Sequence, residues 1–150
     1  MEVPTKEQAD HSLPYVIAVA LLDGEVTPAQ YAPKRILQDD VQALLRKVTV
    51  RPADEYSASF PEELPCHVTI HLGDGQILRK EMRTYPGFTK SPLPWNAVED
   101  KFHRLAEPSA DHFLRDAIVS AVANLDQIRI SELTRLFDQV GGVADIPKAV

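Results

Sequence analysis

The stretch Thr5–Gly24, TKEQADHSLPYVIAVALLDG, places charged and ionisable residues directly before an almost wholly apolar run. Ser12 is a good helix N-cap and Gly24 a good C-terminal stop, so we predict a buried helix over residues 12–22. Pro14 fits this helix because the N–H groups of a first turn have no helical partners. Those free N–H groups carry partial positive charge, which favours an anionic ligand at this end of the helix.

Four candidate ligand-binding residues lie at this helix start. His11 can exchange protons near neutral pH, and Lys6 brings a full positive charge. Asp10 can stabilise the helix start or accept a hydrogen bond from His11. Tyr15 follows His11 by four residues, the spacing of one helical face. Each of these residues also has a structural interpretation, as a solvated polar side chain or, for Tyr15, as a core aromatic.

The composition indicates a globular protein of one domain or slightly more. Of the 150 residues, 44% are hydrophobic and 25% are charged. A net charge of −6 without a basic cluster makes nucleic acid an unexpected partner. The longest apolar run, Val16–Leu22, is far shorter than the roughly 20 residues that span a bilayer, so no membrane partner is expected. Cys66 is the sole cysteine, so no internal disulfide can form, and we expect a cytoplasmic protein.

The middle of the chain predicts a helix followed by strands. A helix is expected from about Asp39, and Val48–Val50 is expected to form a short strand. Cys66–Leu72 alternates between apolar and polar residues, with the Cys66 thiol on the inward face. The residues Gly73–Gly75 then predict a hairpin turn into a second strand, Gln76–Arg83.

The turn at residues 73–75 allows two strand registers. A loop of all three residues pairs Ile70 with Leu78, whereas a two-residue turn pairs Leu72 with Ile77. We favour the first register because it keeps apolar pairs on one face of the hairpin.

The last third of the chain predicts a stiff loop and three helices. The proline-rich loop Tyr85–Trp95 carries Lys90, a second candidate for meeting an anion. Helices are expected over about 95–106, from after Ser109 to about 125, and from a cap at Ser131. This order lacks βαβ alternation and therefore predicts an α+β fold with a small, mainly antiparallel sheet packed with helices.

The histidines do not predict a metal site. His67 and His71 lie roughly 13 Å apart along a strand, from about 3.3 Å per residue. Zinc ligands sit only about 2 Å from the ion, so this pair cannot chelate one zinc directly. His103 and His112 are expected on helix surfaces, and we expect neither a metal nor a cofactor.

Several segments together resemble one known family. ADHSLPY at residues 9–15, the VALLDG helix end and VTPAQY at residues 26–31 are similar to motifs of the MmgE/PrpD family. CHVTIHLGDG at residues 66–75 is similar to the family's hairpin. Residues 87–102, ending in VEDKF, are similar to its proline-rich segment before a helix.

The resemblance implies a division of the chain. Residues 1–106 correspond to the family's α+β lid domain, and residues 107–142 to helices that return to its large helical domain. Residues 143–150 are expected to form a tail. In the family these motifs follow the large helical domain, which the 150 residues do not include.

The resemblance also implies a function. Family members are metal-independent lyases, including 2-methylcitrate dehydratase, that act on small di- and tricarboxylates and are usually dimeric. It implies a catalytic role for His11 and substrate-binding roles for Lys6, Asp10, Tyr15 and Lys90. Most acid–base groups of the family belong to the large helical domain, so we expect half an active site here, inactive by itself, that needs that domain or a partner chain. The alternative is a non-catalytic module that binds carboxylates or pairs with a partner.

Overall fold

A computed structural model describes residues 3–141 of the chain. Its contacts separate two compact units, Met1–Arg83 and Thr84–Val150. The helix over residues 95–106 belongs to the second of these units. The predicted tail, residues 143–150, lies outside the described residues.

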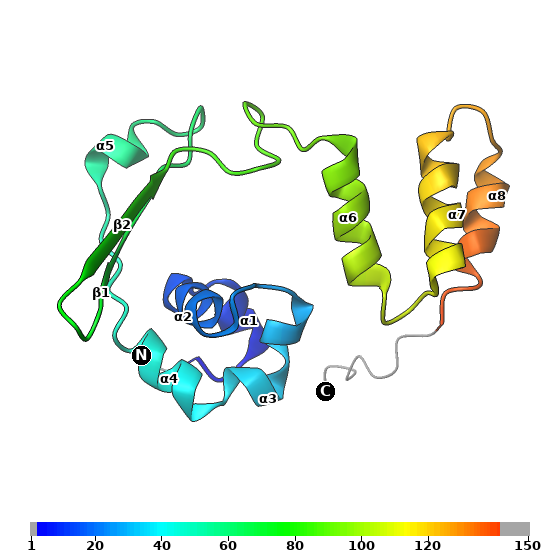
Figure 1. The fold of residues 1–150 in the computed structure, drawn as a ribbon. Coiled ribbons are helices and arrows are strands. Elements are labelled where there is room, and N and C mark those ends of the chain that lie inside the picture. The colour runs from blue at the N-terminus through cyan, green and yellow to red at the C-terminus, as the bar shows by residue number, and fades with distance from the viewer. Residues whose placement is uncertain (1–2, 142–150) are drawn as a thin grey trace. The chain divides into compact units, whose positions relative to one another are not determined.

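The first unit consists of short helices and one β-hairpin (Figure 1). Its elements, in chain order, are α1 (Lys6–Asp10), α2 (Leu13–Asp23), the 3-10 helix η1 (Pro28–Tyr31), α3 (Pro33–Ile36), α4 (Asp39–Leu45), α5 (Asp54–Ser57), β1 (Cys66–His71) and β2 (Ile77–Met82).

Helix α2 begins and ends as its sequence predicts. The Ser12 hydroxyl accepts a hydrogen bond from the N–H of Tyr15 at 3.2 Å, and the Ser12 carbonyl accepts one from Val16 at 3.0 Å. Gly24 closes the helix in the left-handed conformation, with φ at 77°, and donates its N–H to Ala20. The N-cap and the C-cap predictions are both confirmed.

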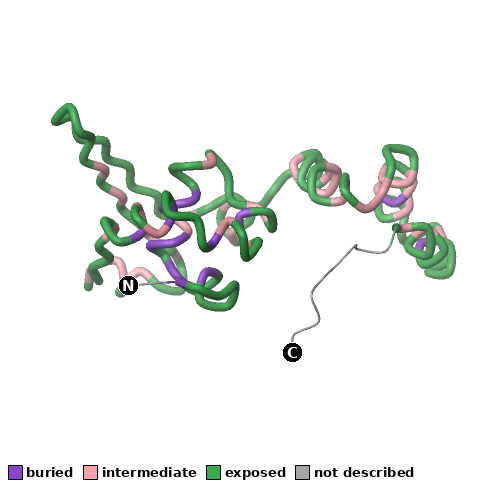
Figure 2. The backbone as a smooth tube through the Cα atoms, turned by 90° about the horizontal axis from the view of Figure 1, so that it is seen from below, coloured by how far each residue is buried: buried purple, intermediate pink, exposed green. Residues whose placement is uncertain are grey.

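The core of this unit gathers where α2 meets the other helices. Its buried side chains are Val3, Ala9, Tyr15, Ala18, Val19, Ile36, Val41 and Leu45. Figure 2 shows buried positions along these helices and none along the hairpin. The prediction that α2 is buried all round is wrong, since Leu13, Leu21 and Leu22 are exposed. The neighbouring helices cover only one side of it.

The hairpin confirms the favoured register. Ile70 pairs with Leu78, and the other partners follow from the same loop of three residues. Gly75 adopts a φ of 87°, and the Asp74 carboxylate accepts a hydrogen bond from the N–H of Gln76 at 2.9 Å. This left-handed position explains why glycine follows the aspartate in the turn.

Two further expectations about strands are wrong. Val48–Val50 is not a strand, because the N–H of Val48 closes the end of α4 by donating to the carbonyl of Leu45. The Cys66 thiol is exposed rather than inward-facing and buried. It lies at the start of β1, in a sheet of only two strands within residues 3–141.

The second unit consists of three helices after the proline-rich loop. These are α6 (Trp95–Ala106), α7 (His112–Ala123) and α8 (Ile130–Phe137). The Asp111 side chain caps α7 by accepting a hydrogen bond from the N–H of Leu114 at 2.8 Å. Helix α8 begins one residue before Ser131, so the predicted cap there is wrong. Helix α7 packs on both α6 and α8.

The fold class is α+β, as the order of elements predicts. No helix within residues 3–141 combines the length and the apolar character needed to cross a membrane.

Candidate functional site

Three of the predicted site residues lie together at the junction of α1 and α2. Lys6 opens α1, Asp10 ends it, and His11 is its C-cap, with its N–H donating to the carbonyl of Ala9. The spacing of Lys6 and Asp10 is one helical turn. All three side chains are exposed, so one short surface segment presents a cation, a carboxylate and an imidazole.

The start of α2 offers a ligand fewer free backbone N–H groups than the sequence suggests. Ser12 already accepts the N–H groups of Tyr15 and Val16, and Pro14 has no N–H to give. A carboxylate at this junction would therefore be held mainly by side chains, with Lys6 and His11 as the donors at hand.

Tyr15 lies in the core instead of on this exposed segment. Its side chain is fully buried, and its hydroxyl donates to the carbonyl of Gln30. Its ring centroid lies 5.8 Å from that of Tyr31. Burial raises the pKa of the Tyr15 hydroxyl, which keeps it protonated as a donor. The structure therefore places Tyr15 where it holds η1 against α2.

Asp10 has an electrostatic connection to the same region. Burial raises the pKa of Tyr31, and the negative charge of Asp10 raises it further. Helix α1 packs on η1, so Asp10 lies near the Tyr15–Tyr31 pair while its carboxylate stays exposed. The exposed junction is thus attached to a buried part of the core.

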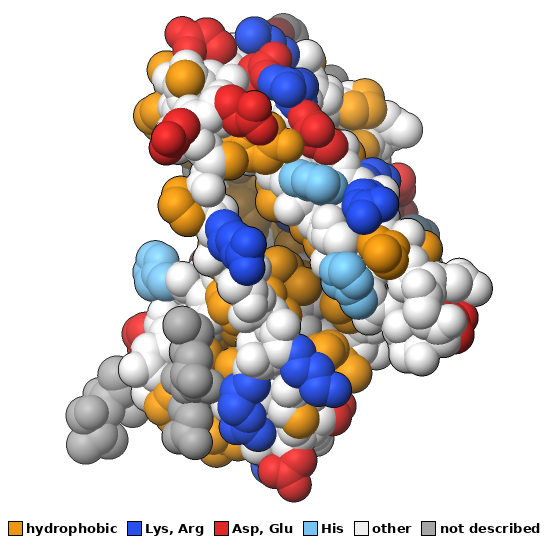
Figure 3. Space-filling model, turned by 90° about the vertical axis from the view of Figure 1, so that its left-hand side faces the viewer, with side chains coloured by type: hydrophobic (Ala, Val, Ile, Leu, Met, Phe, Trp, Pro, Cys, Tyr) orange, Lys and Arg blue, Asp and Glu red, His pale blue; other side chains and the backbone are white. Residues whose placement is uncertain are grey.

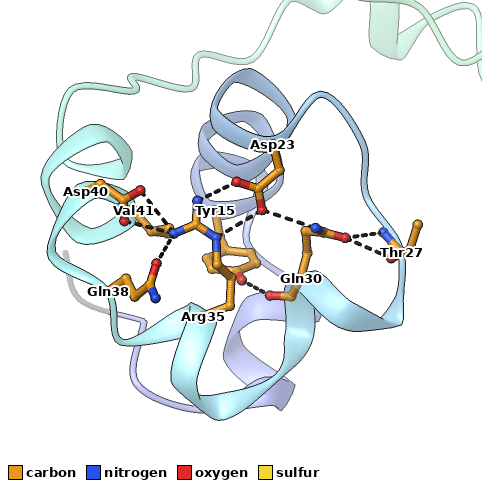
Figure 4. Close-up of polar contacts among 8 residues, drawn as sticks. All are labelled: Tyr15, Asp23, Thr27, Gln30, Arg35, Gln38, Asp40 and Val41. Carbon is orange, nitrogen blue, oxygen red and sulfur yellow. Dashed lines mark hydrogen bonds and ion pairs between the residues drawn. The ribbon is translucent and has the colours of Figure 1, made fainter.

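A polar network behind this core was missed by the sequence analysis. Arg35 donates to both carboxylate oxygens of Asp23, from Nε to Oδ2 at 2.9 Å and from Nη2 to Oδ1 at 2.5 Å (Figure 4). Its Nη1 donates to Asp40 at 2.8 Å and to Gln38 at 2.6 Å. Charge-assisted pairs of this two-point kind are the stronger hydrogen bonds of proteins.

The network also fixes the turn after α2. Gln30 donates from Nε2 to Asp23 at 3.1 Å and accepts the N–H of Thr27 at 2.9 Å. The hydrogen bonds from Arg35 and Gln30 hold the pKa of Asp23 below its usual value, and Arg35 does the same for Asp40. The Thr27–Gln30 spacing is a capping box, and that is the sequence signal that could have predicted this turn.

Lys90 belongs to the second unit, whereas the other four predicted site residues belong to the first. It is exposed in a tight turn in which Gly87 donates to the carbonyl of Ser91 at 2.7 Å and Ser91 donates to that of Phe88 at 2.8 Å. Gly87 has a φ of 98°, a value that favours glycine. The turn gives the Lys90 side chain a defined backbone anchor.

The first unit also contains an open hollow of about 830 Å³. Leu13, Ile17 and Leu21, on the side of α2 away from the core, form one of its walls. Parts of the chain from the end of α4 through α5 to β1 line the rest. Figure 3 shows an apolar hollow bordered by basic and histidine side chains.

The polar lining of this hollow differs from the predicted site. Lys47, Arg51 and the two strand histidines line it, whereas Lys6, Asp10 and His11 do not. Lys47 and Arg51 bring positive charge to it and Glu63 brings one negative charge, while most of the other lining residues are apolar. The hollow is therefore a second candidate binding place in the first unit.

A comparison with known proteins identifies the family of this chain. A family model, the MmgE/PrpD C-terminal domain, matches residues 2–127, which is most of the chain. This chain belongs to the MmgE/PrpD family. The match includes the α1–α2 junction, the polar network, the hairpin and the loop that carries Lys90.

Two curated relatives give the family member that this chain is similar to. This chain is 28% identical over 133 residues to mouse (Mus musculus) cis-aconitate decarboxylase. It is 29% identical over 133 residues to the human (Homo sapiens) protein of the same name. Each alignment covers 88% of this chain and 27% of the relative. The chain therefore spans about a quarter of the length of these relatives.

Proposed function

We propose that these 150 residues are the C-terminal part of a lyase that acts on a small di- or tricarboxylate, in the manner of 2-methylcitrate dehydratase or cis-aconitate decarboxylase. The observation that carries this proposal is the family match over residues 2–127. The similarity to cis-aconitate decarboxylases supports the substrate class. We also propose a cytoplasmic location, which agrees with a single cysteine.

The α1–α2 junction is the proposed contribution to the active site. His11 carries the proton, Lys6 binds a carboxylate of the substrate, and Asp10 orients the imidazole. Their exposure on one segment supports these roles. Tyr15 supports the junction from the core through its hydrogen bond to Gln30.

Lys90 is proposed as a further cation for the substrate. Its exposed side chain on a tight turn supports a binding role. Its unit differs from that of His11, so the proposal includes two separate binding contributions from this chain.

The proposed site is only half of an active site. Dehydration and decarboxylation both need an acid or base near the reacting carbon and a second group for the departing or arriving species. Among the proposed site residues, His11 has the side chain that serves most often as a general acid or base. We propose that the second group comes from a helical domain or a partner chain, and that the 150 residues by themselves are inactive.

An activity assay tests the half-site proposal. The purified 150-residue chain is incubated with 2-methylcitrate and, separately, with cis-aconitate, and the product is measured. We expect no turnover above that of the His11→Ala variant. Turnover by the chain that disappears in His11→Ala would show that the 150 residues hold a complete site.

Citrate binding tests the ligand role of the junction. Each exposed helix-end charge contributes about 0.3–1 kcal/mol, so we expect affinity no tighter than about millimolar. Amide NMR shifts should lie around residues 6–13, weaken as salt rises, and diminish in the Lys6→Ala/His11→Ala double variant. The matched control is Lys34→Ala, which removes an exposed lysine elsewhere in the first unit.

The position of the NMR shifts separates the possible sites. Shifts confined to Gly87–Ser91 would assign the carboxylate to the Lys90 turn, and shifts at Lys47, Arg51 and β1 would assign it to the hollow. Either pattern, or no shift at tens of millimolar citrate, would contradict a ligand role for His11 in this chain.

A second candidate function is a non-catalytic module that pairs with another chain. The observation that favours it is the apolar surface of the second unit, where Phe113, Ile130 and Phe137 are 82%, 65% and 50% exposed. A neighbouring reading frame that encodes the helical domain would favour the lyase, since the two products could then form one active site. Stable expression without such a frame would favour the module.

A further inference from the structure

We propose that His103, His112 and Asp116 form a binding site for a divalent transition-metal ion of the zinc class. One ligand atom from each of these side chains lies within 4.8 Å of the others. The site lies in the second unit and includes none of the residues proposed for carboxylate chemistry. It is independent of the proposed lyase function, and it departs from the expectation of the sequence analysis that the chain binds no metal.

The local sequence places two of the three ligands on one helical face. Asp111 caps α7, so His112 is the first residue of the helix and Asp116 follows four residues later. Residues at this spacing lie one above the other on a helix. The distance from His112 Nε2 to Asp116 Oδ2 is 3.2 Å.

The third ligand comes from the preceding helix. His103 lies in the last turn of α6, which packs beside α7 in the second unit (Figure 1). Arg115 donates from Nη1 to the carbonyl of His103 at 2.6 Å and so attaches α6 to α7 at this level. His103 Nε2 then lies 3.6 Å from Asp116 Oδ1.

A bound metal ion would draw the three ligand atoms closer together than the 4.8 Å within which they lie. Ligand atoms about 2.1 Å from a tetrahedral zinc ion lie about 3.4 Å from one another. The two histidine–aspartate distances, 3.2 Å to Oδ2 and 3.6 Å to Oδ1 of Asp116, are close to that value, so each imidazole already lies beside one oxygen of the same carboxylate. The imidazole rings, with centroids 6.2 Å apart, already converge on the same carboxylate.

The donor set suits zinc and related ions better than calcium or magnesium. Two imidazole nitrogens and one carboxylate oxygen are typical ligands of zinc, whereas calcium and magnesium bind oxygen almost alone. Three protein ligands leave a fourth position for water. A bound ion would link α6 to α7, so it should also stabilise the second unit.

A zinc titration of the metal-free chain tests the site. After removal of metal with a chelator, we expect one zinc ion per chain by calorimetry and a higher midpoint of thermal unfolding with zinc. Loss of an outer-shell partner alone often weakens metal affinity 10–100-fold. We therefore expect His103→Ala, His112→Ala and Asp116→Asn each to weaken zinc binding at least about tenfold.

The control variants remove zinc-ligand side chains that lie outside the proposed site. His67→Ala/His71→Ala and Cys66→Ser change exposed residues of β1 and should leave zinc affinity unchanged. Cobalt(II) in place of zinc should give a spectrum without a thiolate charge-transfer band. Far-UV circular dichroism checks that each variant is folded, and the isosteric Asp116→Asn change keeps the packing of α7.

Two results would overturn the proposal. One is zinc affinity that is unchanged in Asp116→Asn and in both histidine variants. The other is zinc binding that is lost in Cys66→Ser or in the β1 double variant, which would assign the ion to the hairpin.

Discussion

The guanidinium of Arg35 binds the carboxylate of Asp23 at two points, with Nη2–Oδ1 at 2.5 Å and Nε–Oδ2 at 2.9 Å. Both side chains are largely shielded from solvent, with 16% and 18% of their surface exposed. This pair links the end of α2 to α3 across the core. Asp23 also accepts a hydrogen bond from the Gln30 side chain and so supports the turn that carries Gln30. The backbone carbonyl of Gln30 in turn accepts the hydrogen bond of the Tyr15 hydroxyl.

The Asp23 pair predicts a loss of stability at low pH. Hydrogen bonds from Arg35 and Gln30 lower the pKa of Asp23 in the folded state, and an unfolded aspartate has a pKa of about 3.9. A group with a lowered folded pKa stabilises the protein fully above its unfolded pKa, and this contribution is lost as pH falls through the folded pKa. We expect Asp23→Asn to be less stable than wild type at pH 7, and the difference to shrink below about pH 4.

Urea unfolding at a series of pH values measures this effect. The control Asp100→Asn changes an exposed carboxylate of α6 and should differ little from wild type at any of these values. A constant difference between Asp23→Asn and wild type from pH 7 to pH 3 would contradict the role of the charged pair.

The burial of Leu45 and the exposure of Leu37 predict different losses of stability when each is changed to alanine. Leu45 is 1% exposed, whereas Leu37 is 58% exposed. We expect Leu45→Ala to lower the free energy of unfolding by about 2–5 kcal/mol, because it removes buried methyl groups and leaves a cavity. Leu37→Ala should change it by less than about 0.5 kcal/mol. Equal effects in denaturant unfolding would show that α4 does not close the core.

The register of the hairpin predicts which engineered cysteines form a disulfide. Thr69 lies opposite Arg79, whereas the alternative register would place it opposite Lys80. In a Cys66→Ser background, we expect Thr69→Cys/Arg79→Cys to oxidise readily and Thr69→Cys/Lys80→Cys to stay reduced. Mass spectrometry after mild oxidation measures both. The opposite pattern would mean that the strands slip by one residue.

The exposed apolar side chains of the second unit predict self-association. Phe113 of α7 and Ile130 and Phe137 of α8 are at least half exposed. We expect a homodimer in sedimentation experiments at high concentration, weakened by Phe113→Glu. The control is Phe60→Glu, which changes a 65% exposed phenylalanine of the first unit and should leave the dimer intact. A monomer at every concentration would contradict this expectation.

Local patterns determined the parts of this protein that depend on neighbours in the chain. Ser12 and Gly24 bound α2 because caps act on backbone groups only three or four residues away. The register of the hairpin followed from the apolar alternation and the turn, both of which are local. The ADHSLPY motif and the segments after it identified the family from the same kind of information.

The tertiary structure alone decided burial and the meeting of distant side chains. Periodicity predicted that α2 is buried all round, but only one face has helices against it. No local rule predicts that Arg35 meets Asp23 twelve residues away, or that His103 approaches Asp116 from another helix. These distances depend on how helices pack, and packing is set by contacts between residues far apart in the sequence.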